Sequence, residues 1–252
     1  MILSEQQIKD MQEGGKVLAA ILRELLVMVK PGMTTREFDD RARELMREKN
    51  VDPSFPTVDG YPAVICTSIN DEAVHALPSD RVLKDGDLFK IDIGVIHKGL
   101  HTDMATTVIV GGKKFFNKSY SQKQKLLNAT RQALEAGIAK AQAGNTLDDI
   151  SSAIEDRIIK DDFSVVHELG GHGIGRTLHE TPWIANFKGY EDGKTELVSG
   201  MALAIEPISS MGSNKISEGP GGHAYRIKDG ALSAHFEHTI IITDGAPIVV
   251  TK

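Results

Sequence analysis

The sequence predicts an α+β domain that is built from two related halves. Helical segments with one apolar face are followed by short β-rich segments, and one set of short motifs occurs twice along the chain. A chain of 252 residues can bury a large core. We expect a single domain over residues 1–252, with internal halves at roughly residues 1–112 and 113–252.

Composition is that of an ordinary globular protein. Apolar residues make up 40% of the chain and charged residues 25%. The most apolar helical stretch, residues 17–29, carries Arg23 and Glu24, so we predict no membrane span. The N-terminus has no basic region followed by an apolar block, so we predict no secretory signal. The lone cysteine, Cys66, excludes an internal disulfide and fits a reducing, cytoplasmic location.

Net charge bears on the partners. The formal charge is −6, and the chain has no long basic run. Proteins that bind nucleic acid neutralise its phosphates with clustered Lys and Arg side chains. The sequence therefore argues against nucleic acid as the main partner.

One motif occurs in both halves. The letters LKDG at residues 83–86 are followed by four other residues and then by Ile91 and Asp92. The letters LVSG at residues 197–200 are likewise followed by four other residues and then by Ile and Glu at residues 205–206. Each pattern is typical of a Gly-led turn and an apolar strand that ends in a carboxylate.

A second motif precedes the first at nearly the same spacing. The letters GMT at residues 32–34 correspond to GNT at residues 144–146. Threonine is a good N-cap, so each motif predicts the start of a helix. We expect these helices at roughly residues 35–49 and 147–160. Short patterns can recur by chance, but two motifs that both recur after nearly the same number of residues favour two related halves.

Two strands in the first half are expected to bring two aspartates together. Residues 87–93 alternate as a strand does, residues 103–110 are rich in Thr and Val, and residues 97–99 form a plausible turn between them. In a hairpin centred between His97 and Lys98, Asp92 lies directly opposite Asp103. Opposed side chains have Cβ atoms roughly 4.5–5.5 Å apart, and a bulge would shift the pairing by one residue.

The second half repeats this arrangement with a longer loop. Glu206 and Glu237 are equidistant from a point between Gly221 and Gly222, inside the GPGG run at residues 219–222, and each adjoins an apolar, β-rich segment. Any one of these four acids alone is more simply a solvated strand residue or half of a salt bridge. If the halves face each other, however, four carboxylates converge. They cannot all stay ionised without a cation, so the set predicts a site for a divalent metal.

Histidines complete the candidate site. His172 lies in the GGHGIG run at residues 170–175, where little side-chain bulk surrounds the imidazole. That run has neither the spacing of a dinucleotide-binding loop nor a Walker lysine. His75 and His179, taken singly, are more often structural than functional. His101, two residues before Asp103, is a candidate to support a ligand. The remaining histidines receive no metal assignment: His97, His167, His223, His235 and His238.

Other catalytic arrangements are poorly supported. The chain contains neither His-Glu-x-x-His nor Gly-x-Ser-x-Gly. Cys66 is flanked by apolar residues and is more simply a small buried hydrophobe than a nucleophile.

Taken together, these residues resemble the pita-bread metallopeptidases, and most closely the type I methionine aminopeptidases. The matching blocks occur in the family's order and cover nearly the whole chain. They are GYP (60–62), CTSIN (66–70), VLKDGD (82–87), ID (91–92), HTD (101–103), GHGIG (171–175), IEP (205–207) and LSAHFEHT (232–239). The ligand order Asp, Asp, His, Glu, Glu is specific to the superfamily, and the second and last blocks point to the type I enzymes.

The resemblance implies a ligand set and a fold. Asp103 and Glu237 would bridge two divalent metal ions, Asp92 would bind one ion, and His172 and Glu206 would bind the other. A water or hydroxide between the ions would be the nucleophile. The implied fold has two pseudo-twofold-related halves around a central antiparallel sheet, with helices on the outside. The oxygen-rich ligand set suits Mn, Fe or Co at least as well as Zn.

The resemblance also implies roles in catalysis and substrate binding. His75 and His179 would contact the scissile amide and carbonyl, and Glu206 would shuttle protons. The family's substrate-binding positions correspond here to Tyr61, Cys66, His75, Leu178, His179 and His223. The chain departs from the family at three positions beside this pocket. His223 stands where the family often has Trp, and Val58 and Phe55 stand where it often has Tyr and Cys.

The expected function is removal of the N-terminal methionine from peptides and nascent proteins with a small second residue. The expected enzyme is a cytoplasmic monomer that associates transiently with the ribosome and needs neither a membrane nor a specific nucleic acid. The first alternative is an Xaa-Pro aminopeptidase or dipeptidase with the same metal core, although such proteins generally carry an extra N-terminal domain. The same objection applies to a creatinase-like hydrolase. A catalytically silent peptide-binding module is the third, although silent members usually lose metal ligands.

Overall fold

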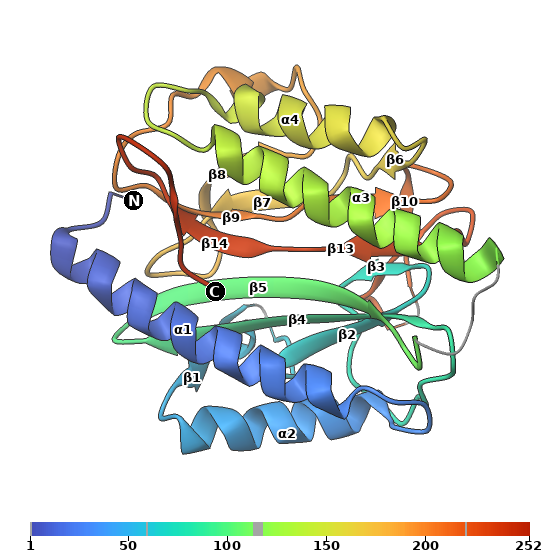
Figure 1. Ribbon diagram of the computed structural model, residues 1–252. Coiled ribbons are helices and arrows are strands. Elements are labelled where there is room, and N and C mark those ends of the chain that lie inside the picture. The colour runs from blue at the N-terminus through green and yellow to red at the C-terminus, as the bar shows by residue number, and fades with distance from the viewer. Residues whose placement is uncertain (1, 59, 113–117, 220) are drawn as a thin grey trace.

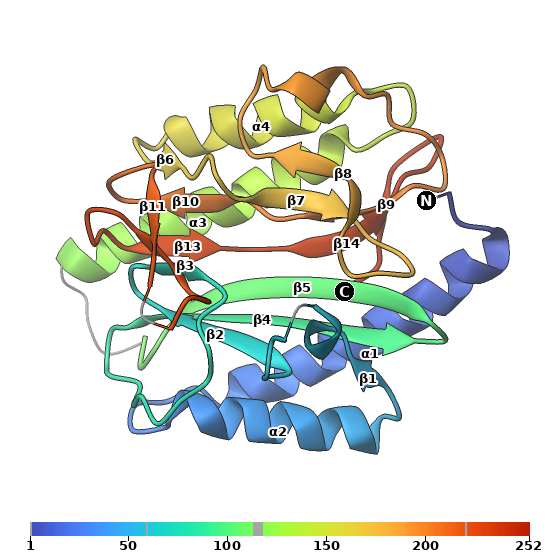
Figure 2. The ribbon, with the colours of Figure 1, turned by 180° about the vertical axis from the view of Figure 1, so that it is seen from behind.

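A computed structural model describes residues 2–58, 60–112, 118–219 and 221–252. Four long helices flank the strands (Figure 1). In that view α3 and α4 lie above the strands, α2 lies below them, and α1 runs diagonally in front of β4 and β5. From behind, strands and loops come forward instead (Figure 2). The helices are α1 (Glu5–Met28), α2 (Thr35–Glu48), α3 (Lys118–Lys140) and α4 (Leu147–Ile159), with short 3-10 turns η1 (Phe55–Thr57) and η2 (Glu191–Lys194).

The strands form four ladders, and each pairing described is antiparallel. The ladders are β1-β4-β2 with β5 on β4, β13-β10-β6, β11-β12-β3, and β15-β14-β9-β7-β8. The prediction of an α+β fold is confirmed. The strands are β1 (Asp52–Pro53), β2 (Ile65–Ile69), β3 (Glu72–Val74), β4 (Leu88–His97), β5 (Leu100–Ile109), β6 (Ser164–Val165), β7 (Gly170–Gly173), β8 (Glu180–Ala185), β9 (Ala202–Ile205), β10 (Ile208–Ser210), β11 (Ile216–Glu218), β12 (Tyr225–Ile227), β13 (Ser233–His235), β14 (His238–Ile241) and β15 (Ile248–Val249).

The two helices predicted from the repeated motif are present and start where expected. Thr34 and Thr146 are the N-caps of α2 and α4. Each hydroxyl accepts a hydrogen bond from the third backbone N–H of its helix, and the acid at that position, Glu37 or Asp149, accepts one from the cap's N–H. Both helices therefore begin with a capping box, which fixes their first turn.

The turns before these helices share the same hydrogen bonds. The Gly32 N–H donates to the Leu83 carbonyl at 2.9 Å, and the Gly144 N–H donates to the Leu197 carbonyl at 3.0 Å. These four residues belong to the repeated sequence motifs, so the internal repeat is also a repeat of structure. The predicted division between the halves at residue 113 lies outside the described residues.

The predicted register of the first hairpin is wrong. The turn is formed by Lys98 and Gly99, one position later than expected, and both have positive φ, at 52° and 75°. Such a two-residue turn matches the right-handed twist of the flanking strands.

Each pairing therefore moves by two residues. Asp92 lies opposite Ala105, and Asp103 lies opposite Gly94. Because a shift of two residues preserves the face of the strand, the two aspartates still point to the same side, as diagonal rather than direct neighbours.

The predicted register of the second half is confirmed. Ile205 pairs with His238 and Ile208 pairs with His235, so both ladders are centred where the sequence places the midpoint of Glu206 and Glu237. Those two glutamates lie between the ladders and belong to neither.

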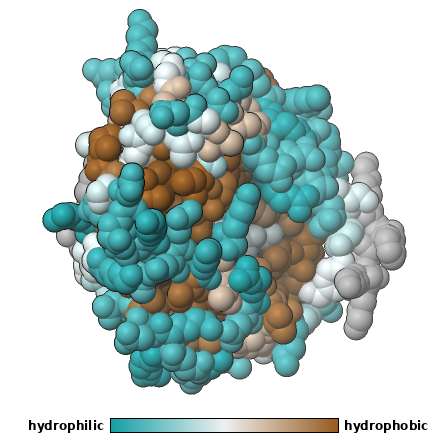
Figure 3. Space-filling view, turned by 60° about the vertical axis from the view of Figure 1, so that its left-hand side comes forward, coloured by the Kyte–Doolittle hydropathy of each residue, from teal (hydrophilic) through white to brown (hydrophobic). Residues whose placement is uncertain are grey.

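Separate apolar clusters anchor the two sets of helices. One packs α1 and α2 against β2 and β4 and includes Phe38 and Phe89, whose ring centroids are 4.9 Å apart. Another packs α3 and α4 against the five-stranded ladder and β13. Apolar side chains reach the surface in patches separated by hydrophilic ones (Figure 3). In the part of the chain described, the helices are all too short or too polar to cross a bilayer.

Gly15 brings α1 against the C-terminal segment. A Cβ atom at Gly15 would lie 2.4 Å from the carbonyl oxygen of Val250. We predict that Gly15→Ala lowers the free energy of unfolding by roughly 1–3 kcal/mol, as overpacking does. Helix propensity alone would make the change stabilising by about 1 kcal/mol. Chemical unfolding measures the difference. Lys16→Ala, at an exposed position of the same helix, is the control, and a more stable Gly15→Ala protein would contradict the packing argument.

Candidate metal centre

The five predicted metal ligands line one cavity of about 230 Å³. They arrive from both halves of the molecule. Asp92 lies on β4 and Asp103 on β5, whereas His172 lies on β7, Glu206 follows β9, and Glu237 lies between β13 and β14. The cavity therefore exists only where the two halves meet.

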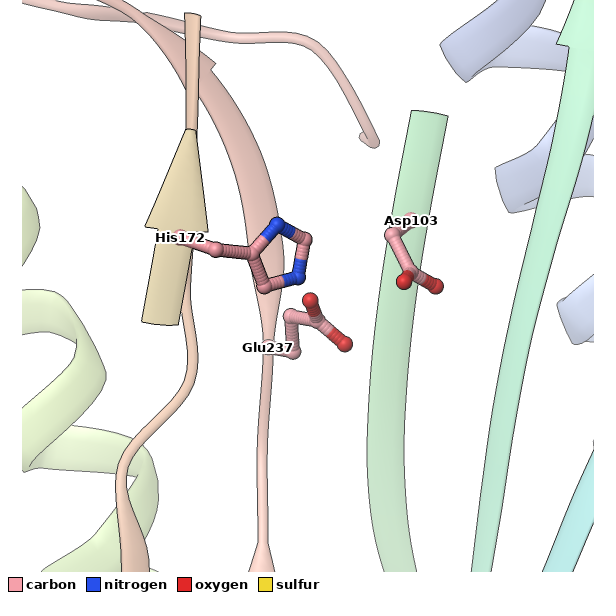
Figure 4. Close-up of side chains that lie close together, drawn as sticks. All are labelled: Asp103, His172 and Glu237. Atoms are coloured by element: carbon pink, nitrogen blue, oxygen red, sulfur yellow. The ribbon is translucent and has the colours of Figure 1, made fainter. Parts of the chain in front are cut away.

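Three of these residues lie close enough to share one ion. Asp103, His172 and Glu237 each offer an atom within 4.8 Å of the others'. Figure 4 shows the His172 ring and the Glu237 carboxylate on one side and Asp103 on the facing strand, with the side chains directed toward one another. Oxygen and imidazole nitrogen ligands at such spacing suit a divalent cation.

Three of the acids are buried, and each has one carboxylate oxygen without a hydrogen-bond donor among the described residues. Asp92, Asp103 and Glu237 are only 8%, 4% and 2% exposed. One oxygen of each, Oδ1 or Oε1, accepts no hydrogen bond from the residues that the structure describes. A buried carboxylate oxygen without a donor is costly. A cation bound between the acids would satisfy all three oxygens, so the residues fit the metal that the sequence predicted.

Burial and mutual repulsion disfavour ionisation of the acids. Burial, with Glu206 next, raises the pKa of Asp103 to about 7. Burial raises the pKa of Glu206 to about 8. The pKa values of Asp92 and Glu237 also lie well above the ordinary range, first from burial and then from the neighbouring acids. A bound cation would reverse this preference, because its charge favours the ionised carboxylates.

His172 is oriented as a metal ligand. Its Nδ1 lies 2.8 Å from the carbonyl of Gly173, so Nδ1–H donates there and Nε2 keeps its lone pair. Nε2 lies 3.7 Å from Glu206 Oε1, on the side of the acids. Burial, with His179 next, lowers the pKa of His172 to about 3. The imidazole is therefore neutral, which is the form that binds metals.

The glycines beside His172 let three strands approach closely. A Cβ atom at Gly171 would lie 2.2 Å from the Ala204 carbonyl oxygen, and one at Gly173 would lie 2.3 Å from the Thr181 carbonyl oxygen. No larger residue fits between β7 and its neighbours at these positions. The glycine-rich run thus positions the ligand's backbone, as the sequence suggested.

The predicted substrate-binding residues line the same cavity. Tyr61, Cys66, Leu178 and His223 form a wall beside the acids, and the Tyr61 hydroxyl donates to the Ile65 carbonyl at 3.2 Å. Phe55 and Val58, at which the chain differs from the family, also line this cavity. So do two residues that were not predicted from the sequence, Gly222 and Tyr225. They lie on and after the Gly-rich loop, and nothing in the local sequence indicates that this loop folds back over the site.

His75 and His179 lie at the edge of the cavity, next to the ligands. The ring of His179 meets that of His172 edge to face, with centroids 4.6 Å apart. His75 has a φ of 61°, a conformation that is uncommon for non-glycine residues. Burial lowers the pKa of both, to about 4 for His75. Both are neutral imidazoles and can donate one hydrogen bond to a bound peptide.

A further histidine, His235, contacts the site without having been predicted there. Its Nε2 lies 3.2 Å from Glu206 Oε2, and the side chain is 1% exposed. Strand alternation places it on the same side as Glu237, two residues later, which is the signal that could have identified it. His101, the candidate to support a ligand, has Nδ1 3.0 Å from Ser54 Oγ, and its support of a ligand stays a prediction.

Comparison with known proteins identifies relatives over the whole chain. The model of metallopeptidase family M24 matches residues 9–244. A methionine aminopeptidase of Clostridium perfringens is 38% identical over 251 residues, which are 100% of this chain and 98% of that protein. Membership of a metallopeptidase family agrees with the cation site that the buried acids form.

Solved structures confirm the fold prediction. The methionine aminopeptidase of Thermotoga maritima superposes with a TM-score of 0.93 at 35% identity and covers 100% of this chain and 99% of its own. An Xaa-Pro dipeptidase of Bacillus anthracis superposes with a TM-score of 0.75 at 23% identity, and this chain covers 62% of it. That second likeness shows a shared fold alone.

The raised pKa values predict how a metal ion affects stability. Acids with raised pKa values stabilise the metal-free fold below the ordinary carboxyl pKa, and this contribution is lost as pH rises through about 7 and about 8. With an ion bound, the same acids are ionised in the folded state. We therefore expect the increase in thermal midpoint caused by Mn(II) to grow between about pH 6 and pH 8.5, because binding displaces protons from the acids.

The comparison of metal-loaded and metal-free protein at each pH removes the contributions of other buried groups. A gain of about 1 kcal/mol corresponds to roughly 2–4 °C for a chain of this size. Asp103→Asn is the control and should weaken the response at every pH. A midpoint increase that does not vary with pH would show that the acids are already ionised without metal.

Proposed function

The chain belongs to metallopeptidase family M24, and on that basis we propose that it is an aminopeptidase that removes N-terminal methionine when the second residue is small. Its substrates are peptides, including the N-termini of nascent proteins. The observation that carries the proposal is a single cavity in which buried acids and a neutral imidazole adjoin an apolar wall. The acids hold metal for hydrolysis, and the wall receives the N-terminal side chain.

We further propose that the site holds two divalent ions. Asp103 and Glu237, which face each other across the halves, would contact both ions. Asp92 would hold one, and His172 and Glu206 the other. When bound, such ions lower the pKa of a water molecule and polarise the scissile carbonyl. The oxygen-rich ligand set suits Mn, Fe or Co at least as well as Zn.

The chain's own residues orient the substrate and move the proton. His75 and His179 are neutral and border the ligands, so their N–H groups can donate to the scissile amide and to the carbonyl oxygen as charge develops on it. Glu206 lies between His172 Nε2 and His235 Nε2, at 3.7 and 3.2 Å. We assign it the transfer of a proton to the leaving amine.

The wall of the cavity suits a methionine side chain. Leu178 and Cys66 are apolar and each 3% exposed, and Tyr61 turns its hydroxyl away to a backbone carbonyl. A flexible, polarisable thioether fills such an irregular apolar space well. His223, whose ring centroid lies 5.8 Å from that of Tyr61, closes this wall from the loop side.

Three parts of the proposal rest on the family resemblance and the composition. They are transient association with the ribosome, a monomeric state and a cytoplasmic location. The lone cysteine supports only the location. Co-sedimentation with ribosomes and sedimentation equilibrium would test the first two.

Peptide cleavage tests the substrate assignment. We predict that the metal-loaded protein releases methionine from Met-Ala and Met-Gly peptides faster than it cleaves Leu-Ala or Xaa-Pro peptides. Exhaustive chelation should abolish the activity, and Mn, Co or Fe should restore it, because the cation supplies most of the charge stabilisation. Faster cleavage before proline would replace the substrate assignment and leave the metal site intact. Full turnover by verified metal-free protein would overturn both.

His179→Ala tests the assignment of the hydrogen-bond donor. We predict normal metal content and a kcat lower by roughly 10²–10³, the loss expected of one donor to a developing oxyanion. Metal content, thermal midpoint and kcat are measured on one preparation. His97→Ala, which removes a histidine paired with Glu13 outside the cavity, is the matched control. Loss of an ion would make His179 a ligand, and early melting with normal kcat would make it structural.

A further inference from the structure

A second cavity, of about 380 Å³, continues from the metal site toward β8. In the ladder that contains the site, β8 is the terminal strand (Figure 2). The two cavities have four residues in common, and these are the predicted catalytic and ligand residues His75, His172, His179 and Glu206. The shared residues therefore stand at the junction between the apolar wall and the second cavity.

Trp183 of β8 borders this second cavity beside the metal ligand. It is the Cα partner of His172 in the β7–β8 ladder. Directly opposed residues of an antiparallel pair project to the same face, with Cβ atoms roughly 4.5–5.5 Å apart. A Cβ atom at Gly170 would lie 3.1 Å from Trp183 Nε1, so the indole lies over the glycine. The ring thus extends along β7, away from the ligand.

Other aromatic side chains hold the indole in place. Its ring centroid lies 5.4 Å from that of Tyr190 and 6.3 Å from that of Phe187, both with steeply inclined planes. Phe187 in turn stacks on His167 at 4.4 Å. Despite this packing, Trp183 remains 39% exposed. A large apolar side chain that is both fixed and exposed beside a site is typical of a ligand contact.

Four of the remaining lining residues are apolar: Val74 of β3, Leu169, Ile208 of β10 and Trp183. Gly170 and the polar residues Glu180 and Thr181 of β8 complete the lining. Val74 and Ile208 belong to one buried apolar cluster, which gives the cavity a rigid floor. An apolar or aromatic group of a ligand would be shielded from water on several sides there.

We propose that this second cavity binds the part of the substrate that follows the cleaved bond, and that Trp183 selects an apolar or aromatic side chain there. The inference rests on the proposed function. The first cavity takes the N-terminal side chain, and the shared histidines take the scissile amide, so the rest of the peptide continues into the second cavity. An extended chain advances about 3.3 Å per residue. The indole is therefore within reach of the second or third residue beyond the cleaved bond.

Peptides that differ only in the position of one phenylalanine test the subsite. The metal-loaded protein is assayed with Met-Ala-Gly-Gly, Met-Ala-Phe-Gly and Met-Ala-Gly-Phe. We expect kcat/KM to be roughly three- to tenfold higher for at least one phenylalanine peptide than for the glycine peptide, as befits one aromatic contact. Trp183→Ala should bring this ratio to about one, whereas Trp183→Phe should retain most of it.

Val27→Ala controls for the loss of an exposed apolar side chain, because Val27 is 88% exposed on α1, outside both cavities. It should leave the ratio as in the unmodified protein. Equal rates for all three peptides in the unmodified protein would overturn the proposal. So would a preference that survives Trp183→Ala, or an equal loss on every peptide, since the latter indicates a structural role.

Tryptophan fluorescence gives a readout that does not need turnover. Trp183 is the only tryptophan in the chain, so its emission reports this cavity alone. Titration with Ala-Phe-Gly should shift the emission at a lower concentration than titration with Ala-Gly-Gly. An absent response to both peptides would overturn the subsite. Failure to cleave any Met peptide, together with a selective response to Ala-Phe-Gly, would overturn the proposed function and leave the subsite standing.

Discussion

The repulsion among four carboxylates in one cavity, three of them buried and the fourth largely so, is the constraint on which the rest of the structure depends. Asp92, Asp103, Glu206 and Glu237 share one cavity, and burial holds their pKa values high. A protein tolerates such a cluster only if protons or a cation neutralise it. Two aspartates come from one half and two glutamates from the other, so the same charge balance governs both the metal site and the contact between the halves.

Helix caps, apolar clusters and hydrogen bonds between the halves fix the strands that carry these acids. Capping boxes fix the first turns of α2 and α4, and apolar clusters pack each helix pair against its own strands. Hydroxyl groups then link the halves: the Thr239 hydroxyl accepts from the Asp103 N–H at 2.8 Å, and the Thr107 hydroxyl donates to the His235 carbonyl. These hydrogen bonds join β5 of the first half to β13 and β14 of the second half. A continuous ladder between the halves would leave no room for the cavity.

One glycine-rich strand serves both the metal and the substrate. In β7 the absence of side chains at Gly171 and Gly173 lets neighbouring carbonyls approach, and the imidazole of His172 is set by its bond to the Gly173 carbonyl. Gly170, on the same strand, provides the surface on which Trp183 lies. The glycines of this strand therefore serve both the metal ligand and the proposed subsite, because neighbouring backbone and the indole ring can approach β7 closely.

The sequence by itself determined the helix starts and the second-half register, because caps and alternation are local signals. It also indicated the five residues that line the cavity, through four acids at related positions, a histidine among glycines and the resemblance to the metallopeptidases. It misplaced the β4–β5 register, because the turn depends on Lys98 adopting a positive φ, which local propensity does not predict. Only the tertiary structure revealed His235 beside Glu206 and Trp183 beside His172. Alternation could have placed His235 on the side of Glu237, but its contact with Glu206 depends on how the segment after β9 packs against β13. Trp183 meets His172 through the β7–β8 pairing, whose register shifts beside His172, and no local pattern encodes that shift.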